Sequence, residues 1–343
     1  MKAPTSIAIM GDGQMGLVLS SLLAQKGGYD VRMWGHDPRT LAQLAQTRAS
    51  SRLKGFTLPD DVRVVPDAGE ALEGSELIVA ASPTQFLRPV WEGFDGLVPG
   101  GVGVVSVAKG LEIGSELRPT QVLREVIGDD PDRAPRSIGT LSGPTIAAEM
   151  AHCLPATIVS ASDDEKFAQS VQRTFTTTWM RVYTSTDPLG VELAGAVKNV
   201  IAIAAGILDG LQAGYNAKSA LLARGLAEIA RLGSAMGAQS ETFWGLAGAG
   251  DLATTCFSPE GRNRTCGEAL GKGESLDDYI ERTHSVVEGV STTKSVVTIA
   301  KRYKVDMPIT QAVHAVLYEG LDPIEAIAKL MNRPATSETG SQG

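Results

Sequence analysis

Short apolar runs separated by polar or glycine-rich segments fill the first half of the chain. Their length and continuous hydrophobicity are typical of strands buried on both faces, and they lie at residues 6–10, 29–34, 62–65, 77–81, 102–107, 137–141 and 157–160. Helical segments lie between several of them, for example at residues 17–24, 66–72 and 115–126. This alternation predicts a mostly parallel, doubly wound α/β sheet, in which a ligand binds beyond the carboxyl ends of the strands.

The pattern changes after the last strand-like run, at residues 181–184. From Pro188 onward the apolar positions recur at helical spacing, at residues 191–206, 219–236, 291–303, 310–318 and 323–331. Pro308 and Pro323 stand where helices commonly begin. The sequence therefore predicts an α/β domain over residues 1–187 and an all-α domain over residues 188–333. The polar tail at residues 334–343 is expected to be disordered.

A glycine-rich turn joins the first strand to the first helix. Gly11, Gly13 and Gly16 form a G-x-G-x-x-G sequence between them, and a second strand follows at residues 29–34. In this setting the glycines permit a tight turn, a close approach of backbone amides to a pyrophosphate, and packing of the helix on the strand. The helix N-terminus favours the anion. We predict a Rossmann-type domain that binds NAD(H) or NADP(H). The alternative is a glycine-rich turn without a ligand.

The residues after the second strand bear on the choice between the two cofactors. An acidic residue commonly ends this strand and binds the ribose 2′-hydroxyl. Here Gly35 takes that place, followed by His36 and Asp37. His36 could meet a 2′-phosphate and Asp37 could meet a hydroxyl, so we favour NADP(H) and leave the use of both cofactors open.

Lys198 lies within residues 191–206, a helical segment that is apolar on every face. A lysine buried there loses solvation, which lowers its pKa and makes it a usable proton donor or acceptor near neutral pH. The alternative is a lysine whose stem runs along the core to water.

Three further polar positions stand out. Lys109 follows the strand at residues 102–107, where it could bind an anionic substrate or simply face solvent. Asp251 follows a run of glycines and could be a helix N-cap. Arg262 and Asn263 offer donors suited to a phosphate, or they form a surface loop.

Composition narrows the class of protein. The chain has 343 residues, of which 43% are hydrophobic and 20% charged, as in ordinary soluble proteins. A net charge of −8 argues against a general nucleic-acid surface. No apolar stretch reaches membrane-spanning length without interruption, so we expect no membrane insertion. Three cysteines, an odd number without metal-ligand spacing, favour reduced thiols in the cytoplasm, and four scattered histidines do not suggest a metal centre.

The chain resembles the bacterial type of the NAD(P)-dependent glycerol-3-phosphate dehydrogenase family. The matching segments include Ser-Gly-Pro at residues 142–144, Lys-Asn-Val at 198–200 and Gly-Arg-Asn at 261–263. Others lie at residues 34–38, 108–112, 224–228, 250–252, 286–289 and 307–310, in the family's order. The resemblance implies reversible hydride transfer between NAD(P)H and dihydroxyacetone phosphate, giving sn-glycerol 3-phosphate for glycerophospholipid synthesis. It also implies a homodimer.

The resemblance also implies a role for individual residues. Lys198 would be the general acid and base, with Lys109 and Asp251 beside the reacting carbonyl. The substrate would meet Lys109, Gly143, Thr145, Lys198, Asn199, Asp251, Arg262 and Asn263. The cofactor would meet Gly11, Gly13, Gln14, Met15, Gly16, His36, Lys109, Ala147, Arg262 and Glu288, and no metal is needed because the nicotinamide carries the hydride.

The glycine-rich turn departs from the family pattern at three positions. The family more often has Gly-Ala-Gly, then serine or asparagine, then tryptophan or tyrosine, where this chain has Asp12, Gln14 and Met15. A carboxylate at position 12 would repel a pyrophosphate unless it is turned away, which would weaken cofactor binding.

Two other functions fit parts of the sequence. A related two-domain dehydrogenase acting on a β-hydroxyacid would share the sheet, the helices and the lysine–asparagine pair, but Arg262 and Asn263 suit a phosphate instead. A catalytically silent NAD(P)-binding regulator would keep the fold without needing Lys109, Lys198 and Asp251 together.

Overall fold

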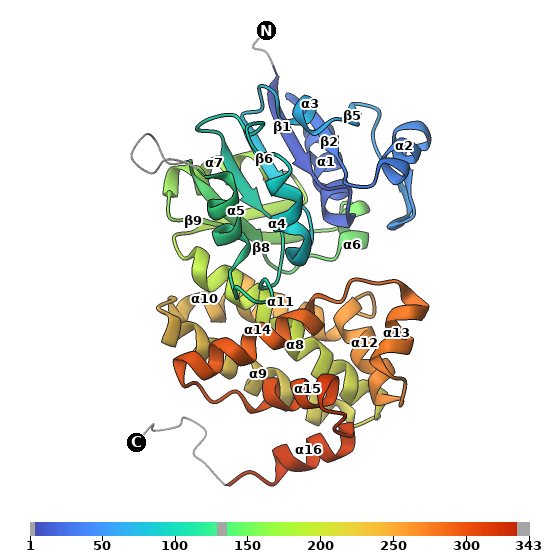
Figure 1. Ribbon diagram of the computed structural model, residues 1–343, viewed down its shortest axis with the longest axis vertical. Coiled ribbons are helices and arrows are strands. Elements are labelled where there is room, and N and C mark those ends of the chain that lie inside the picture. Colours follow the sequence, from blue (N-terminus) through green and yellow to red (C-terminus); the bar gives the residue numbers. More distant parts are fainter. Residues whose placement is uncertain (1–3, 129–135, 335–343) are drawn as a thin grey trace.

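A computed structural model describes residues 4–128 and 136–334. An α/β part, which holds the sheet, lies against one side of a part built from helices (Figure 1). The arrangement confirms the expected order of a Rossmann-type sheet followed by an all-helical region. The tail predicted to be disordered lies outside the described residues from residue 335 on.

The sheet has eight strands in the order β10-β9-β8-β7-β6-β1-β2-β5. All neighbouring pairs are parallel except β8 and β9. The chain order reverses between β1 and β6, so a crevice for a ligand is expected outside the carboxyl ends of these two strands. The strands are β1 (Thr5–Met10), β2 (Tyr29–Trp34), β5 (Val62–Val64), β6 (Leu77–Ala80), β7 (Gly103–Ser106), β8 (Ile138–Ser142), β9 (Ala156–Ser162) and β10 (Met180–Ser185).

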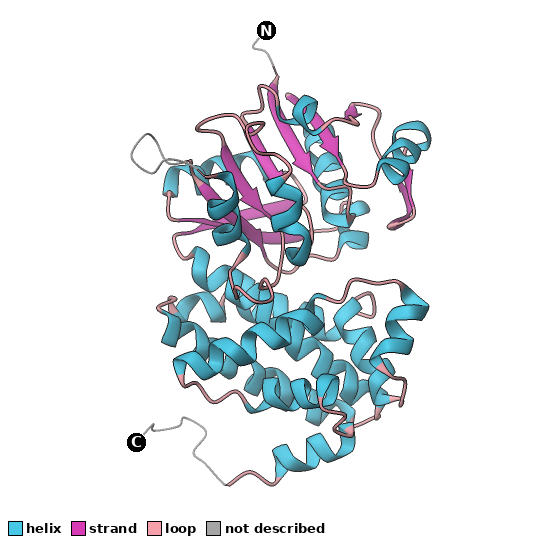
Figure 2. Cartoon of the chain, in the orientation of Figure 1, coloured by secondary structure: helices cyan, strands magenta, loops and turns pink. Residues whose placement is uncertain are grey.

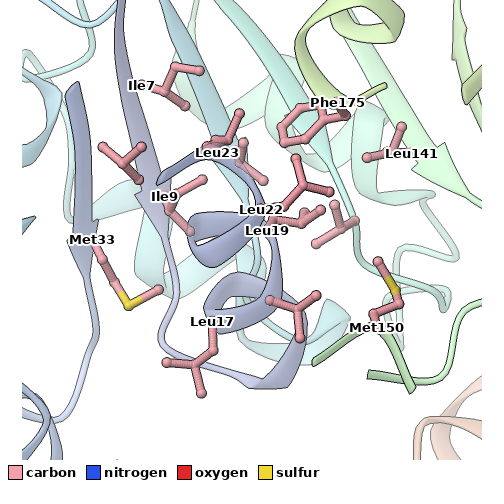
Figure 3. Close-up of a cluster of buried hydrophobic side chains, with 14 of the residues drawn as sticks. Ile7, Ile9, Leu17, Leu19, Leu22, Leu23, Met33, Leu141, Met150 and Phe175 are labelled. Carbon is pink, nitrogen blue, oxygen red and sulfur yellow. The ribbon is translucent and has the colours of Figure 1, made fainter. Parts of the chain in front are cut away.

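Helices cover both faces of this sheet because successive side chains of a strand point to opposite sides. Ile7 and Ile9 of β1 belong to one core cluster with apolar residues of α1 (Gln14–Lys26) and with Phe175 at the end of α7 (Glu165–Phe175), as Figure 3 shows. Ala8 and Met10 pack on the other face, in a separate core cluster. The helices of that face are α3 (Ala68–Leu72), α4 (Thr84–Glu92) and α5 (Pro119–Ile127). The strands therefore carry continuous apolar runs.

The structure differs from the predicted elements in places. The helix expected at residues 115–126 begins only at Pro119, because Glu116 has a left-handed backbone (φ +57°) that a helix cannot contain. The helix expected at residues 66–72 begins at Ala68, after the N-cap Asp67. The elements that the pattern missed are α2 (Pro38–Thr47), α4, α6 (Ala147–Ala151), α7 and an antiparallel pair of strands, β3 (Ala49–Ser50) and β4 (Leu53–Thr57).

The second part of the structure is helical among the described residues (Figure 2). Its central helix is α8 (Pro188–Gly210), around which most of the other helices pack. They are α9 (Gly214–Met236), α10 (Ser240–Trp244), the π-helical turn η1 (Leu246–Gly250), α11 (Asp251–Phe257), α12 (Arg262–Gly271), α13 (Leu276–Thr283), α14 (Glu288–Tyr303), α15 (Pro308–Tyr318) and α16 (Pro323–Met331). The sequence pattern did not predict the helices from α10 to α13.

Only α8, among the described helices, is long and apolar enough to cross a membrane. Its most hydrophobic window is 94% buried inside the protein, which identifies it as a core helix. The last strand ends at Ser185 and α8 begins at Pro188. The domain bounds 1–187, 188–333 and 334–343 remain predictions.

Glycines allow α12 to lie unusually close to α8. A Cβ atom on Gly206 would lie 1.9 Å from the carbonyl oxygen of Arg264, and one on Gly267 would lie 2.0 Å from that of Ile203. Any larger residue would force the two backbones apart. This packing fixes the N-terminus of α12, which carries Arg262 and Asn263, against the middle of α8.

Candidate active site

The carboxyl ends of β7 and β8 meet the helical part of the protein at α8 and α11 (Figure 1). Lys109 follows β7, and Gly143 and Thr145 follow β8. Lys198 lies near the middle of α8, and Asp251 begins α11. The hydrogen bonds described below join these five residues, so the structure brings together most of the positions expected to surround the reacting group.

A glycine lets the strand ends approach α8. A Cβ atom on Gly195 would lie 3.0 Å from the hydroxyl oxygen of Ser142 and 3.7 Å from Cγ of Lys109. Lys198 and Asn199 lie three and four residues further along, on the same side of the helix. Asn199 Nδ2 donates a hydrogen bond to the backbone oxygen of Lys109 at 3.2 Å. The helix therefore also holds the loop that carries Lys109.

Lys198 is buried, with only 6% of its side chain exposed. Its Nζ donates a hydrogen bond to Asp251 Oδ1 and another, of 2.6 Å, to the hydroxyl of Thr255. The pKa of Lys198 is lowered to about 8, chiefly by burial, with the charge of Asp251 opposing this change and the positive charge of Lys109 adding to it. The alternative of a lysine that reaches water is wrong. The ammonium is protonated at neutral pH and can release its proton under mildly alkaline conditions.

Lys109 also points inward. Its Nζ donates hydrogen bonds to the backbone oxygen of Gly143 at 2.9 Å, to Asp251 Oδ2 at 2.8 Å and to the hydroxyl of Thr145 at 3.3 Å. The alternative of a solvent-facing loop lysine is therefore wrong. Lys109 and Lys198 share the one carboxylate of Asp251, which leaves an excess of positive charge. Such a cluster can stabilise an oxygen atom that becomes negative during a reaction.

Asp251 is not an N-cap, contrary to one interpretation of the sequence. It is the first residue of α11, follows the π-helical turn η1, and is 1% exposed. Its carboxylate bridges the two lysines instead of closing the helix end.

The sequence analysis gave no role to Thr255. The Thr255 hydroxyl donates to the backbone oxygen of Asp251 at 2.6 Å, which leaves its lone pairs to accept from Lys198. The spacing of four residues from Asp251 was the available signal, because it places both side chains on one helix face.

The N-terminus of α12 offers donors for an anion. Arg262 is exposed there, and the preceding Gly261 provides no side-chain cap for the helix. Asn263 is buried, and its Oδ1 accepts a hydrogen bond of 2.8 Å from the backbone nitrogen of Gly289. This bond fixes the orientation of the amide. The two Nδ2 hydrogens of Asn263 have no acceptor among the described residues and stay available as donors. Arg262 and Asn263 begin a helix and do not form the alternative surface loop.

Glu288 connects the helical part to the sheet part. It begins α14, and its Oε1 accepts a hydrogen bond of 3.1 Å from the backbone nitrogen of Thr84 at the start of α4. Its Oε2 is buried and has no partner among the described residues. Burial raises the pKa of Glu288 to about 7, against the opposing effects of the Thr84 hydrogen bond and the nearby charge of Arg262.

The glycine-rich turn has the shape that a dinucleotide requires. A Cβ atom on Gly11 would lie 2.7 Å from the backbone carbon of Ala81, at φ +141°, and one on Gly16 would lie 2.0 Å from the backbone oxygen of Gly11. Gly13 caps α1 without a side-chain hydrogen bond, so the first amides of that helix stay free for an anion. These residues fit a bound pyrophosphate.

Four further expected cofactor residues, Gln14, Met15, His36 and Ala147, belong to the sheet part and make no contact described above with the Lys198 cluster. Gln14 is exposed and donates a hydrogen bond of 2.7 Å to the backbone oxygen of Arg52. Met15 and Ala147 pack against the core of the sheet part. His36 is exposed beyond β2, with its ring in a T-shaped arrangement with that of Trp34.

The described residues contain no group of three or more His, Cys, Asp or Glu side chains placed to hold a metal ion. The expectation of a reaction without a metal remains a prediction from the cofactor's chemistry.

Comparison with protein families gives matches over almost the whole chain. The model for the N-terminus of NAD-dependent glycerol-3-phosphate dehydrogenase matches residues 6–168, and the model for its C-terminus matches residues 187–328.

Individual proteins agree with these family matches. The glycerol-3-phosphate dehydrogenase [NAD(P)+] of Prosthecochloris aestuarii is 46% identical over 97% of this chain and 99% of its own length. That of Lacticaseibacillus paracasei is 44% identical over 98% of this chain and 97% of its own. The crystal structure of glycerol-3-phosphate dehydrogenase from Coxiella burnetii superposes with a TM-score of 0.90 at 34% identity, over 96% of this chain and 99% of that one.

Proposed function

The chain belongs to the NAD-dependent glycerol-3-phosphate dehydrogenase family, and we propose that it transfers hydride reversibly between NAD(P)H and dihydroxyacetone phosphate to give sn-glycerol 3-phosphate. NAD(P)-dependent glycerol-3-phosphate dehydrogenase activity follows from this membership, and so does the use of a nicotinamide cofactor. The membership decides against the alternative of a β-hydroxyacid dehydrogenase. The observation that supports the mechanism best is the buried cluster of Lys198, Asp251 and Lys109.

Lys198 serves in this proposal as general acid in reduction and as general base in oxidation. Reduction of a ketone places negative charge on its oxygen, and a neighbouring ammonium both stabilises that charge and donates the proton. A pKa of about 8 suits both directions because neither form of Lys198 is rare near neutral pH. Asp251 and Thr255 hold the ammonium in place, and Lys109 adds a second positive charge. When bound, the nicotinamide supplies or accepts the hydride.

The substrate phosphate lies, in this proposal, at the N-terminus of α12. Arg262 provides a planar fork of donors, Asn263 provides its free amide hydrogens, and the helix end provides a partial positive charge. The remaining substrate contacts are assigned to Gly143, Thr145 and Asn199, which adjoin Lys109.

The cofactor residues are assigned on the same basis. Gly11, Gly13 and Gly16 receive the pyrophosphate, and Glu288, with its buried unpartnered oxygen, lies near Arg262. The further proposed contacts are Gln14, Met15, His36, Lys109, Ala147 and Arg262.

The physiological setting is also part of the proposal. The product would supply glycerophospholipid synthesis, and the protein would act as a homodimer in the cytoplasm. Three free thiols, two of them buried, are consistent with a reducing compartment.

The proposed reaction is tested by following the absorbance of NADH and of NADPH, in parallel reactions, after dihydroxyacetone phosphate is added. Unphosphorylated dihydroxyacetone is the matched control for the role of Arg262 and Asn263. We expect oxidation of the cofactor with the phosphate ester and very slow oxidation without the phosphate. Cofactor binding without oxidation by either ketone would contradict the proposal and favour the silent regulator.

A further inference from the structure

The carboxylate of Asp12 occupies the position of a side chain that is missing from the end of β2. The residue after β2 is Gly35, and a Cβ atom built on it would lie 2.6 Å from Cγ and 2.9 Å from Oδ1 of Asp12. Asp12 comes from the glycine-rich turn, so its side chain reaches across from the end of β1 to the end of β2. The Asp12 side chain therefore points toward Gly35. Repulsion of the pyrophosphate, which the sequence suggested, is not the main effect of this carboxylate.

Asp12 is buried but incompletely paired. It is 4% exposed, and its only ion pair among the described residues joins Oδ1 to Nη1 of Arg52 at 3.4 Å. Its Oδ2 is buried and has no hydrogen-bond partner among the described residues. A buried carboxylate oxygen without a donor is unfavourable. A hydroxyl group of a ligand would supply the missing hydrogen bond.

Asp37, the acid that follows β2, already serves another purpose. Its Oδ1 accepts from the backbone nitrogen of Arg39 at 3.1 Å, and its Oδ2 accepts from the backbone nitrogen and hydroxyl of Thr40 at 3.4 and 2.5 Å. The side chain is used as the N-cap of α2. A ribose hydroxyl at Asp37 would have to share a carboxylate that already caps this helix.

In nucleotide-binding sheets of this topology, an acid at the end of the second strand commonly binds the ribose 2′-hydroxyl of NAD. We propose that Asp12 supplies this carboxylate from the glycine-rich turn, and that it makes the protein prefer NAD(H) over NADP(H). The inference rests on the proposed function, because it concerns the cofactor of that reaction. It reverses the preference for NADP(H) that His36 suggested.

Arg52 sets how strict this preference is. It lies between β3 and β4, and its backbone oxygen accepts a hydrogen bond of 2.7 Å from Nε2 of Gln14. Its side chain is 44% exposed and, among the described residues, has a single long contact, with Asp12, so it is free to turn toward another anion. The 2′-phosphate of NADP(H) would be repelled by Asp12 and attracted by Arg52. The pair therefore permits NADP(H) as the weaker cofactor.

The test measures dissociation constants of NADH and NADPH without substrate, by calorimetry or cofactor fluorescence, for the intact protein and three variants. The intact protein should bind NADH more tightly. Asp12→Asn keeps the shape and removes the charge, and we expect NADH binding to weaken about tenfold while NADPH binding is kept or improved. Arg52→Gln should weaken NADPH about tenfold and NADH much less. Lys54→Ala, which removes an exposed cation on the neighbouring strand β4, is the control and should change neither.

Asp12→Ala, measured alongside, covers the case in which the asparagine variant folds poorly, and thermal unfolding of each variant checks the fold. The proposal would be overturned if both Asp12 variants keep the ratio of NADH to NADPH affinity of the intact protein, whether the two affinities stay the same or weaken equally. A failure of this inference can be told apart from a failure of the proposed function, because the dissociation constants are measured without turnover. A protein that shows these affinities without reducing dihydroxyacetone phosphate would contradict the proposed function alone.

Discussion

Replacing Lys198 by methionine separates the functional role of this residue from any structural role. Lys198 is buried, and its pKa is lowered from 10.5 to about 8 chiefly by desolvation. Each factor of ten in an ionisation constant is worth ~1.4 kcal/mol, so the charged side chain costs the folded protein about 3 kcal/mol. The folded pKa is the lower one, so this cost is fully present below about pH 8 and disappears as the pH rises toward 10.5.

The Lys198→Met variant should therefore lose activity without losing stability. Asp251 keeps its 2.8 Å contact with Lys109 after the substitution, so no unpaired buried charge is left. We expect the free energy of unfolding at pH 7 to be unchanged or higher. Loss of both the proton donor and a positive charge should lower kcat by roughly a thousandfold.

The assay combines steady-state oxidation of NADH by dihydroxyacetone phosphate, urea unfolding and the dissociation constant of NADH. Lys301→Met, an exposed lysine on α14, is the matched control and should leave all three unchanged. The reasoning is refuted if Lys198→Met retains more than about a tenth of the activity, because removal of a general acid should lower the activity much more than that. It is also refuted if the variant loses stability and cofactor affinity together with activity.

Substitutions at three further positions test other parts of the site. Thr255→Val removes a hydrogen-bond acceptor of Lys198 and should lower kcat about tenfold, while Thr255→Ser should not; equal kcat values in the two variants would contradict the assigned contact. Arg262→Ala should raise KM for dihydroxyacetone phosphate at least about tenfold and change kcat less, and an unchanged KM in the same assay would remove Arg262 from phosphate binding. Gly16→Ala places a Cβ atom 2.0 Å from the backbone oxygen of Gly11, so NADH binding measured by calorimetry should be lost, and normal affinity would show that the turn can adjust.

The sheet could be predicted because both of its faces are covered by helices. Residues such as Ile7 and Ala8 point to opposite faces and are both fully buried, so β1 appears in the sequence as an unbroken apolar run. The short strands β3 and β4 gave no such signal because four of their seven residues are exposed. The helix α4 was missed because it is short and contains Pro89.

The candidate site could be predicted only in part. Lys198 was recognisable because a charge interrupts an otherwise apolar helix. Thr255 and Arg52 were not, because their importance arises from contacts with Lys198 and Asp12, which are distant in sequence. Asp251 was ambiguous, since a residue that begins a helix after glycines is more often a cap than a buried ion-pair partner.

The pH dependence of kcat/KM, measured in both directions of the reaction, tests the central claim most directly. The claim is that one buried ammonium, that of Lys198, gives up and takes back the proton of the reaction. Reduction of dihydroxyacetone phosphate requires the protonated form, so its kcat/KM should fall as the pH rises through about 8. Oxidation of sn-glycerol 3-phosphate requires the neutral form, so its kcat/KM should rise through the same pH. Profiles that show no opposite changes near this pH would contradict the claim.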